Sequence, residues 1–244
     1  MLAIFRIIFL FFSFFLICLF GIFNCVVRPK CLQHTFLLGK LFGRLSKILG
    51  VKVIVRISKK SKELMKLPSI YIGNHQSFYD IFTISNAIQP YTVTVGKKNL
   101  IFIPIFGQLY WLCGNVLLDR KNRDQIRKSI LKIIRYIRNQ GRSVWIFPEG
   151  TRNKGKNLLP FKNGAFRIAK ISRVPIIPIC SSEISRKIRL NRWRNGTVII
   201  EILDPIFIED QKYDKRSLTC LKKFCFNLMK KKIFSLNQEI KKSN

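Results

Sequence analysis

Acidic residues and histidines are both scarce in this chain. Asp and Glu together number 12 against 45 Lys and Arg, which gives the 244 residues a formal net charge of +33, and there are only two histidines. Such an excess of positive charge suits nucleic acid, an anionic membrane or an acidic protein partner. A genome-wide bias toward Lys, Ile, Phe and Asn would also produce part of it. Nucleic-acid binding is not predicted, because no zinc-ligand spacing, RNP-like strand or basic region with heptads occurs.

Cysteine pairs of the C-x-x-C type are also missing, and the seven cysteines form no cluster with a histidine. An odd number of cysteines scattered through apolar stretches is typical of buried free thiols in a reducing compartment. We therefore predict no metal site and no cofactor. Cys113 lies close to a motif described below, but no histidine near it in sequence could activate it as a nucleophile.

No internal repeat or low-complexity linker divides the chain. Its length suffices for one well-packed core with a small appendage. We expect residues 1–50 to form a membrane-associating helical anchor and residues 51–244 to form the main domain.

Residues 2–27 are apolar apart from Arg6 and a few small polar side chains, and phenylalanine is heavily represented. The run is long enough to cross a bilayer as a helix. A cleaved signal peptide is not expected, because the run is too long and no A-x-A site follows it.

Residues 31–50 carry apolar side chains at helical spacing and cations on another face. The apolar positions are Leu32, Phe36, Leu41, Leu45 and Ile48, and the cationic ones are Lys40, Arg44 and Lys47. This pattern fits a helix in a membrane interface, and equally a surface helix packed on the domain. The first helix either spans the bilayer or dips with the second into one leaflet. Either way, the basic remainder is expected on the cytoplasmic side.

Beyond residue 50, strand-like and helical segments alternate. Seven runs rich in Val and Ile are predicted strands, at residues 51–56, 69–73, 91–95, 115–118, 143–147, 175–179 and 197–203. Helices are predicted at 124–139, where Gly141 ends the pattern, and at 164–172 and 215–240. Strands alternating with helices predict an α/β fold with a central sheet.

The segment from Asn74 to Asp80 places a histidine and a carboxylate in one short stretch. An imidazole accepts protons near neutral pH, and a fixed carboxylate holds it in one tautomer and stabilises the imidazolium. In one continuous helix the two side chains would lie roughly 140° apart. We therefore expect a strand to end at Gly73, His75 to lie in a turn, and a helix to start at Ser77.

Asp80 has a second interpretation. A serine followed three residues later by an acidic residue is typical of a helix N-terminal capping box, here Ser77 and Asp80. We expect capping and catalytic roles to exclude each other only if the Asp80 side chain folds back onto the Ser77 backbone.

A second polar segment, Phe147 to Arg152, follows a strand-like run. Its carboxylate, glycine and arginine suit the binding of a polyol phosphate better than core packing. These two segments, with Gly114 to Arg120 and Val174 to Ile179, resemble in kind and order the motifs of the glycerolipid acyltransferase family. The resemblance extends nearly end to end, and is strongest to bacterial members that acylate lysophosphatidic acid.

The resemblance implies a mixed central β-sheet flanked by helices, with an N-terminal apolar two-helix membrane anchor. It also implies transfer of an acyl group from a thioester to the sn-2 hydroxyl of 1-acyl-sn-glycerol 3-phosphate, which yields phosphatidic acid. His75 would take the hydroxyl proton and later protonate the departing thiolate, while Asp80 orients His75. No covalent acyl-enzyme is required, because the acceptor supplies the nucleophile.

Three cations are expected to hold the acceptor phosphate. The resemblance implies that Arg120 and Arg152 face it, because a guanidinium binds phosphate oxygens in a bidentate manner. Lys97 is the third candidate. For Arg120, an ion pair with Asp119 or a solvated basic face is the alternative.

Three further residues complete the expected substrate site. Glu149 and Thr151 would hold the glycerol backbone or the arginines. Gly150, which lacks a side chain, would let the substrate approach the main chain.

The expected partners are lysophosphatidic acid, membrane lipids, and acyl-CoA or acyl carrier protein as donor. The expected location is the cytoplasmic face of the bacterial inner membrane, through the N-terminal helices. Two alternatives stay open: an acyltransferase for glycerol 3-phosphate or another lysophospholipid, and a non-enzymatic protein that binds a membrane surface or an anionic partner.

Overall fold

A seven-stranded sheet runs through the molecule in the order β1-β7-β6-β2-β5-β3-β4. The computed structural model describes residues 1–29, 31–119, 122–184, 187–208 and 215–243. The strands are β1 (Val51–Ile57), β2 (Ile70–Gly73), β3 (Thr92–Lys97), β4 (Val116–Leu118), β5 (Ser143–Ile146), β6 (Ile176–Ser181) and β7 (Gly196–Ile202). Each lies where the sequence predicts a strand, to within a few residues at its ends.

The sheet is mixed, as expected. Strands β6, β2, β5, β3 and β4 are parallel to one another, whereas β7 is antiparallel to β6 and parallel to β1. The carboxyl ends of the five parallel strands therefore meet along one edge of the sheet. In open α/β sheets this edge is where ligands bind.

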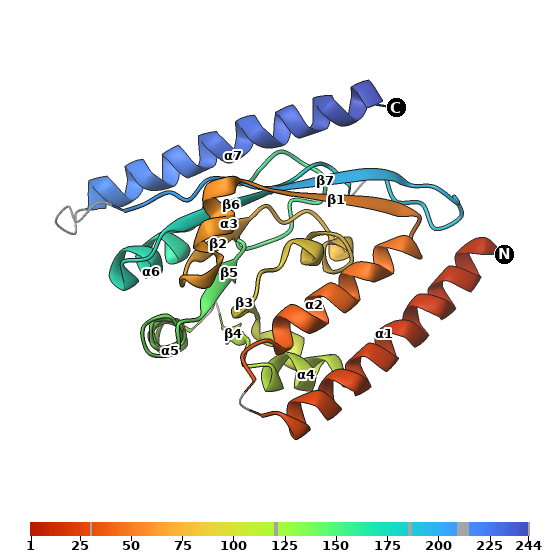
Figure 1. Ribbon diagram of the computed structural model, residues 1–244, viewed down its shortest axis with the longest axis horizontal. Coiled ribbons are helices and arrows are strands. Elements are labelled where there is room, and N and C mark those ends of the chain that lie inside the picture. Colours follow the sequence, from red (N-terminus) through yellow and green to blue (C-terminus); the bar gives the residue numbers. More distant parts are fainter. Residues whose placement is uncertain (30, 120–121, 185–186, 209–214, 244) are drawn as a thin grey trace.

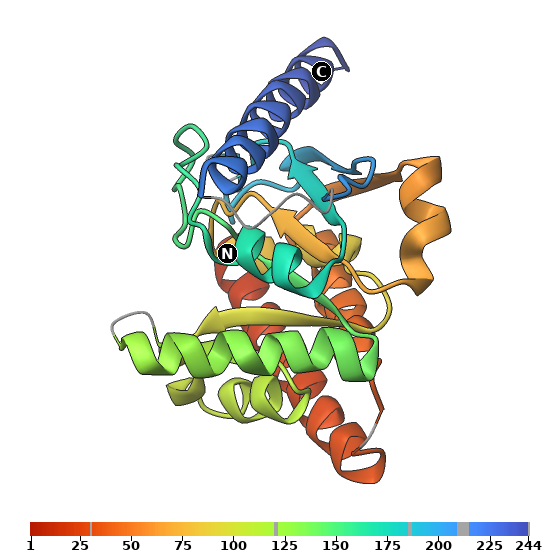
Figure 2. The same cartoon turned by 90° about the vertical axis from the view of Figure 1, so that its left-hand side faces the viewer.

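Helices cover both faces of the sheet (Figure 1). One face packs against α5 (Arg123–Gln140), α6 (Gly164–Ser172) and α7 (Lys215–Ser243), which Figure 2 shows arranged one above another. The other face packs against α2 (His34–Arg44), and α1 (Leu2–Val27) lies outside α2 and contacts it (Figure 1). Consecutive strand residues point to opposite faces.

Strand β2 shows how one sequence serves both layers. Ile70 and Ile72 belong to the core beneath α5, α6 and α7, while Tyr71 belongs to the core beneath α1 and α2. All three side chains are buried. Both faces of the central strands are therefore covered, which explains why these strands read as continuous apolar runs.

Several short helices were not predicted. They are α3 (Lys59–Glu63), η2 (Leu64–Lys66), η4 (Ile84–Ala87), η5 (Lys98–Phe102) and α4 (Phe106–Leu112), whereas η1 (Leu45–Lys47) falls within the helical stretch predicted at 31–50. Each has at most two turns, too few for helical periodicity to appear in the sequence. The helix expected from Ser77 is present as a single 3₁₀ turn, η3 (Phe78–Ile81), capped by Ser77.

The two N-terminal helices differ from each other. Among the described residues, α1 alone is long and apolar enough to cross a membrane, and 11% of its most apolar stretch is buried. Helix α2 has 11 residues and packs on the domain through side chains that include Leu38 and Phe42. The expected two-helix anchor is thus supported for α1 only, and α2 behaves as the packed surface helix. The boundary at residue 50 stays a prediction.

Contacts near both ends hold α1 against the domain. The buried Arg6 guanidinium donates to the carbonyls of Leu190 (3.1 Å), Trp193 (2.8 Å) and Arg192, all in the connection between β6 and β7. Near the other end, the Cys25 and Cys113 sulfurs lie 3.7 Å apart. Helix α1 therefore lies along the domain and does not project from it, as Figure 1 shows.

Gly50 makes this arrangement possible and offers a test of it. Its φ is +68°, and an added Cβ would lie 2.1 Å from the carbonyl oxygen of Trp193. Gly141 has a similar φ of +62°, but nothing lies within 4 Å of an added Cβ. We expect Gly141→Ala to lower the free energy of unfolding by about 1 kcal/mol, the cost of left-handed backbone. Gly50→Ala should cost at least about twice that, because it also displaces the Arg6 contacts.

Unfolding of both variants in detergent, followed by circular dichroism, measures the difference. Equal losses would show that the Trp193 carbonyl does not constrain Gly50.

Candidate active site

The predicted site residues gather at the edge where the parallel strands end. His75 follows β2 by two residues, Lys97 is the last residue of β3, and the segment Glu149 to Arg152 begins three residues after β5. Strands β2, β5 and β3 are adjacent in the sheet. Segments that lie far apart in sequence are therefore brought together by strand order alone.

His75 and Asp80 are in direct contact, as predicted. The imidazole Nδ1 lies 2.6 Å from Asp80 Oδ2, and the side chains are 22% and 7% exposed respectively. Because an ionised carboxylate only accepts hydrogen bonds, Nδ1 carries the proton and Nε2 is left with a free lone pair. The pair has the geometry of a general base with its orienting carboxylate.

Asp80 also caps the η3 turn. The same oxygen, Oδ2, accepts the backbone N–H groups of Gln76 (2.7 Å) and Ser77 (3.2 Å). We expected the two roles to exclude each other only if the Asp80 side chain folded back onto the Ser77 backbone; it does fold back, and it still contacts the imidazole. In so short a turn, the Ser77 amide and the imidazole reach the same oxygen, so one carboxylate builds the turn and holds His75.

Two buried amides flanking His75 fasten this turn to strand β6. Asn74 donates to the Ser181 carbonyl (3.0 Å) and accepts its N–H (2.8 Å). Gln76 donates to the same carbonyl (3.1 Å) and accepts the N–H of Ile184 (3.0 Å). Neither amide was predicted to have a role. Their placement on both sides of the histidine was the available signal.

Glu149 fixes the main chain of His75 through a hydrogen bond. It is 2% exposed, and its Oε1 accepts the His75 N–H (2.7 Å) while Oε2 accepts the Leu159 N–H (2.8 Å). Burial raises the pKa of this carboxyl above its ordinary value, and the two N–H donors act in the opposite direction. Both oxygens are engaged by the protein, which favours a positioning role over the predicted grip on glycerol or the arginines.

Phe147 fixes the plane of the imidazole. Its ring stacks on that of His75, with centroids 4.2 Å apart and planes 16° from parallel. Phe147 opens the second polar segment of the sequence, but no function was predicted for it. With Asp80 at one edge of the ring and Phe147 on one face, the imidazole has little freedom to rotate.

The rest of the second polar segment lies at the protein surface beside the His75 turn. Thr151 and Arg152 are exposed, and the Arg152 guanidinium lies 5.9 Å from the centre of the Phe78 ring, next to the His75 turn. Gly150 adopts a φ of +71°, and a Cβ there would lie 2.9 Å from the Lys162 side chain. Lys162, and not open space, therefore covers the glycine expected to admit substrate.

Lys97, another predicted cation, lies next to strand β4. Lys97 is exposed at the end of β3, and its neighbour Lys98 pairs with Asp119 at 3.2 Å. Arg120 lies outside the described residues, so its contact with a phosphate stays a prediction.

Cysteine and metal chemistry find little support. The Cys113 thiol is buried, and burial raises its pKa well above the ordinary value, so it stays neutral and unreactive. In the part of the chain that the structure describes, no three or more His, Cys, Asp and Glu side chains group as metal ligands.

An imidazole hydrogen-bonded to a carboxylate, with exposed cations at the same strand ends, can deprotonate an acceptor that carries an anionic group. Residues 50–182 match the family model described as Acyltransferase. The chain belongs to this acyltransferase family.

Two bacterial relatives share one name. The chain is 47% identical over 229 residues to the 1-acyl-sn-glycerol-3-phosphate acyltransferase of Haemophilus influenzae, covering 94% of each chain. It is 45% identical over 240 residues to that of Escherichia coli, covering 98% of this chain and 96% of the other.

A crystal structure with the same fold comes from Thermotoga maritima. It is described as the 1-acyl-sn-glycerophosphate (LPA) acyltransferase, PlsC, and aligns with a TM-score of 0.74 at 23% identity. The alignment covers 96% of this chain and 95% of that one. The mixed sheet and its flanking helices are thus a known arrangement.

Two substitutions separate the roles of Asp80. Asp80→Asn keeps an oxygen for the Gln76 and Ser77 amides but loses the charge that stabilises an imidazolium. We expect kcat to fall by about 10²–10⁴-fold with little change in melting temperature. Asp80→Ala removes the acceptor as well, and should also cost about 1 kcal/mol of stability, as for a lost helix cap.

Steady-state kinetics and thermal unfolding of both variants, measured side by side, give the result. An Asn variant with wild-type kcat, or one as unstable as the Ala variant, would contradict this division.

Proposed function

We propose that this protein transfers a fatty acyl group from a thioester to the sn-2 hydroxyl of 1-acyl-sn-glycerol 3-phosphate, producing phosphatidic acid. The observation that carries the proposal is the His75–Asp80 pair, held at the strand ends of a chain similar over nearly its whole length to enzymes with that name. An acyltransferase for glycerol 3-phosphate or another lysophospholipid is the alternative.

The geometry supports a direct transfer. His75 Nε2 takes the proton of the sn-2 hydroxyl as its oxygen attacks the thioester carbonyl. The resulting imidazolium is stabilised by Asp80 across the 2.6 Å contact. When the tetrahedral intermediate collapses, the C–S bond breaks and the imidazolium protonates the departing thiolate. The acyl group passes straight to the acceptor, and the neutral imidazole is restored.

The acceptor phosphate is held by cationic side chains at the carboxyl ends of the parallel strands. Arg152 supports this role because its exposed guanidinium lies beside the His75 turn. Lys97 borders the same edge from β3, and Arg120, beyond the described residues, is the third candidate. A guanidinium contributes two parallel hydrogen bonds to a phosphate, whereas an ammonium acts as a point charge.

The membrane association of α1 is best explained by insertion into one leaflet. A spanning helix would carry Arg6 toward the far side of the bilayer. Arg6 is instead bonded to the same domain that the other end of α1 touches. Positive charge retained near α1 favours the cytoplasmic face of the membrane.

The acyl donor is a separate question. The net charge of +33 would favour an acidic carrier protein as donor alongside acyl-CoA.

One assay tests the function. Purified enzyme in detergent receives an acyl thioester with lysophosphatidic acid, glycerol 3-phosphate or a neutral lysophospholipid, and thiol release is followed. We expect transfer to lysophosphatidic acid, and a fall of at least about 10²-fold for His75→Ala, because a general base is lost. Preference for another acceptor would select the alternative, and no transfer to any acceptor would remove the enzymatic proposal.

Arg152 gives a narrower test. Arg152→Ala should raise the KM for lysophosphatidic acid by about tenfold or more, because a charge-assisted hydrogen bond contributes about 1.5–3 kcal/mol. The KM for the thioester should hardly change, and Arg152→Lys should restore the acceptor KM only in part. Arg135→Ala, which removes an exposed arginine of α5, is the matched control. A rise in the KM for the thioester donor alone would show that Arg152 binds the donor and not the acceptor phosphate.

A further inference from the structure

We propose that the segment formed by η5 and α4, residues 98–112, is a second membrane-inserting element that enters the same anionic leaflet as α1. The proposal rests on the membrane association proposed above, and adds a surface from the middle of the chain to it. Four large apolar side chains of this segment face solvent: Phe102 (77% exposed), Ile103 (42%), Trp111 (58%) and Leu112 (38%).

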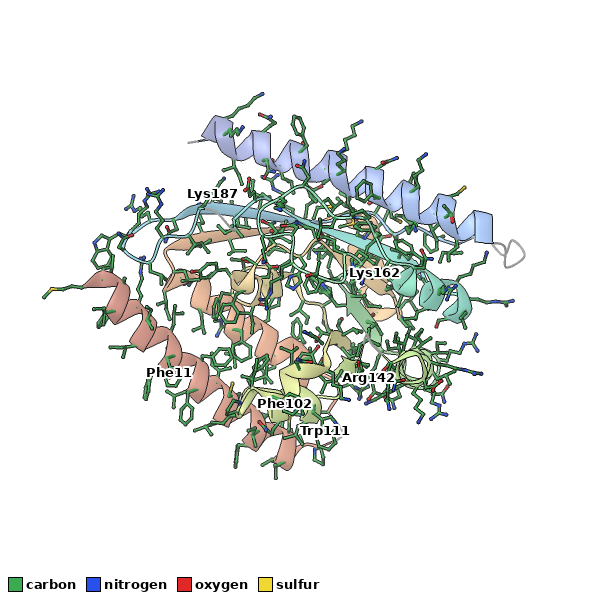
Figure 3. All side chains as sticks on the ribbon, turned by 180° about the vertical axis from the view of Figure 1, so that it is seen from behind. Phe11, Phe102, Trp111, Arg142, Lys162 and Lys187 are labelled. Carbon is green, nitrogen blue, oxygen red and sulfur yellow. The ribbon has the colours of Figure 1, made fainter. Side chains whose placement is uncertain are left out.

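Such a cluster on a folded domain marks an interaction surface. Its residue types fit a bilayer, because tryptophan is enriched at the boundary between lipid and water and phenylalanine buries a large apolar area. Figure 3 shows Phe102 and Trp111 on the same side of the molecule as Phe11, which is exposed on α1.

The new surface is continuous with α1. Helix α4 packs directly on α1, where the methyl groups of Leu109 approach Gly21 so closely that an added Cβ would lie 2.8 Å from one of them. The Cys113 and Cys25 sulfurs meet beside this contact. Because the inner face of α4 is buried against α1, Trp111 on its exposed side extends the apolar surface of α1 outward. A leaflet that receives α1 therefore meets α4 next.

Positive charge borders the apolar cluster. A groove of about 460 Å³ lies beside Trp111, between η5 and α5, and its lining includes Lys98, Lys128 and Lys132. Lys98 pairs with Asp119, but neither Lys128 nor Lys132 contacts a carboxylate among the described residues. Cations next to an apolar tip attract the phosphate groups of anionic lipids. This charge pattern selects an anionic leaflet over an apolar protein partner.

Insertion here would set the depth of the active site. Segment η5 begins at the residue after Lys97, which ends β3 at the edge where His75 lies. With Phe102 in the acyl region and the lysines among the headgroups, Lys97 would lie at the level of the lipid phosphates. The acceptor could then reach His75 from the leaflet without leaving it.

The first experiment moves one indole across the molecule. The full chain is reconstituted in bilayers with phospholipids brominated on their acyl chains, which quench nearby tryptophans. Wild type is compared with Trp111→Phe/Phe234→Trp, which places the indole on α7, on the opposite side of the sheet from α1. Trp145 and Trp193 are present in both proteins, so their contributions to the quenching cancel when the two proteins are compared. We expect a quenched component in wild type that is lost in the variant; equal quenching would overturn the proposal.

The second experiment uses activity, with a matched control. Phe102→Ser/Trp111→Ser should lower kcat/KM for lysophosphatidic acid in vesicles containing phosphatidylglycerol by about tenfold or more, given the apolar area lost from the lipid contact. Transfer to a monomeric short-chain acceptor should be unchanged, which excludes misfolding. Phe224→Ser/Phe234→Ser removes two exposed aromatics from α7 and should leave both rates unchanged.

The outcomes separate the two proposals. A uniform loss on both acceptors, or no loss on vesicles, would overturn insertion of this segment. If wild type acylates neither acceptor, the proposed function fails, while the quenching result still decides whether residues 98–112 enter the bilayer.

Discussion

The hydrogen bond between His75 Nδ1 and Asp80 Oδ2 is the contact around which the rest of the site is built. At 2.6 Å it fixes the tautomer that leaves Nε2 able to take a proton. The Asp80 carboxylate is nearly buried, and hydrogen bonds must offset the free-energy cost of removing its charge from water. The Gln76 and Ser77 amides provide them, so the capping of η3 and the orientation of His75 are a single interaction.

The turn that carries His75 leaves its strand inside the protein, where unpaired peptide groups are costly. The Asn74 and Gln76 side chains form hydrogen bonds with peptide groups at and just after the end of β6, and the Glu149 carboxylate accepts the His75 N–H. Phe147 then stacks on the ring. Two of these supports, Phe147 and Glu149, lie in the segment that directly follows the neighbouring parallel strand, β5. The order of strands in the sheet therefore brings together the histidine and the groups that fix it.

Much of this could be predicted from the sequence. Strands covered on both faces are long apolar runs, and α5 shows clear periodicity over 18 residues, so both were identified. The His75–Asp80 pair was identified because it is local. The role of Glu149 was not, because its partner lies 74 positions away and the sequence does not show which group faces it. Helix α4, with seven residues, is too short for its pattern to be recognised.

The central claim concerns one proton, and the two histidines of the chain allow it to be located. His34 Nε2 lies 2.7 Å from the Arg28 carbonyl, which only accepts, so His34 should carry its proton on Nε2 and His75 on Nδ1. Nitrogen-15 NMR of histidine-labelled protein, well above the ordinary imidazole pKa of about 6.5, distinguishes the tautomers, and His34→Gln assigns them. Opposite tautomers are predicted. A proton on Nε2 of His75 would contradict its role as the base.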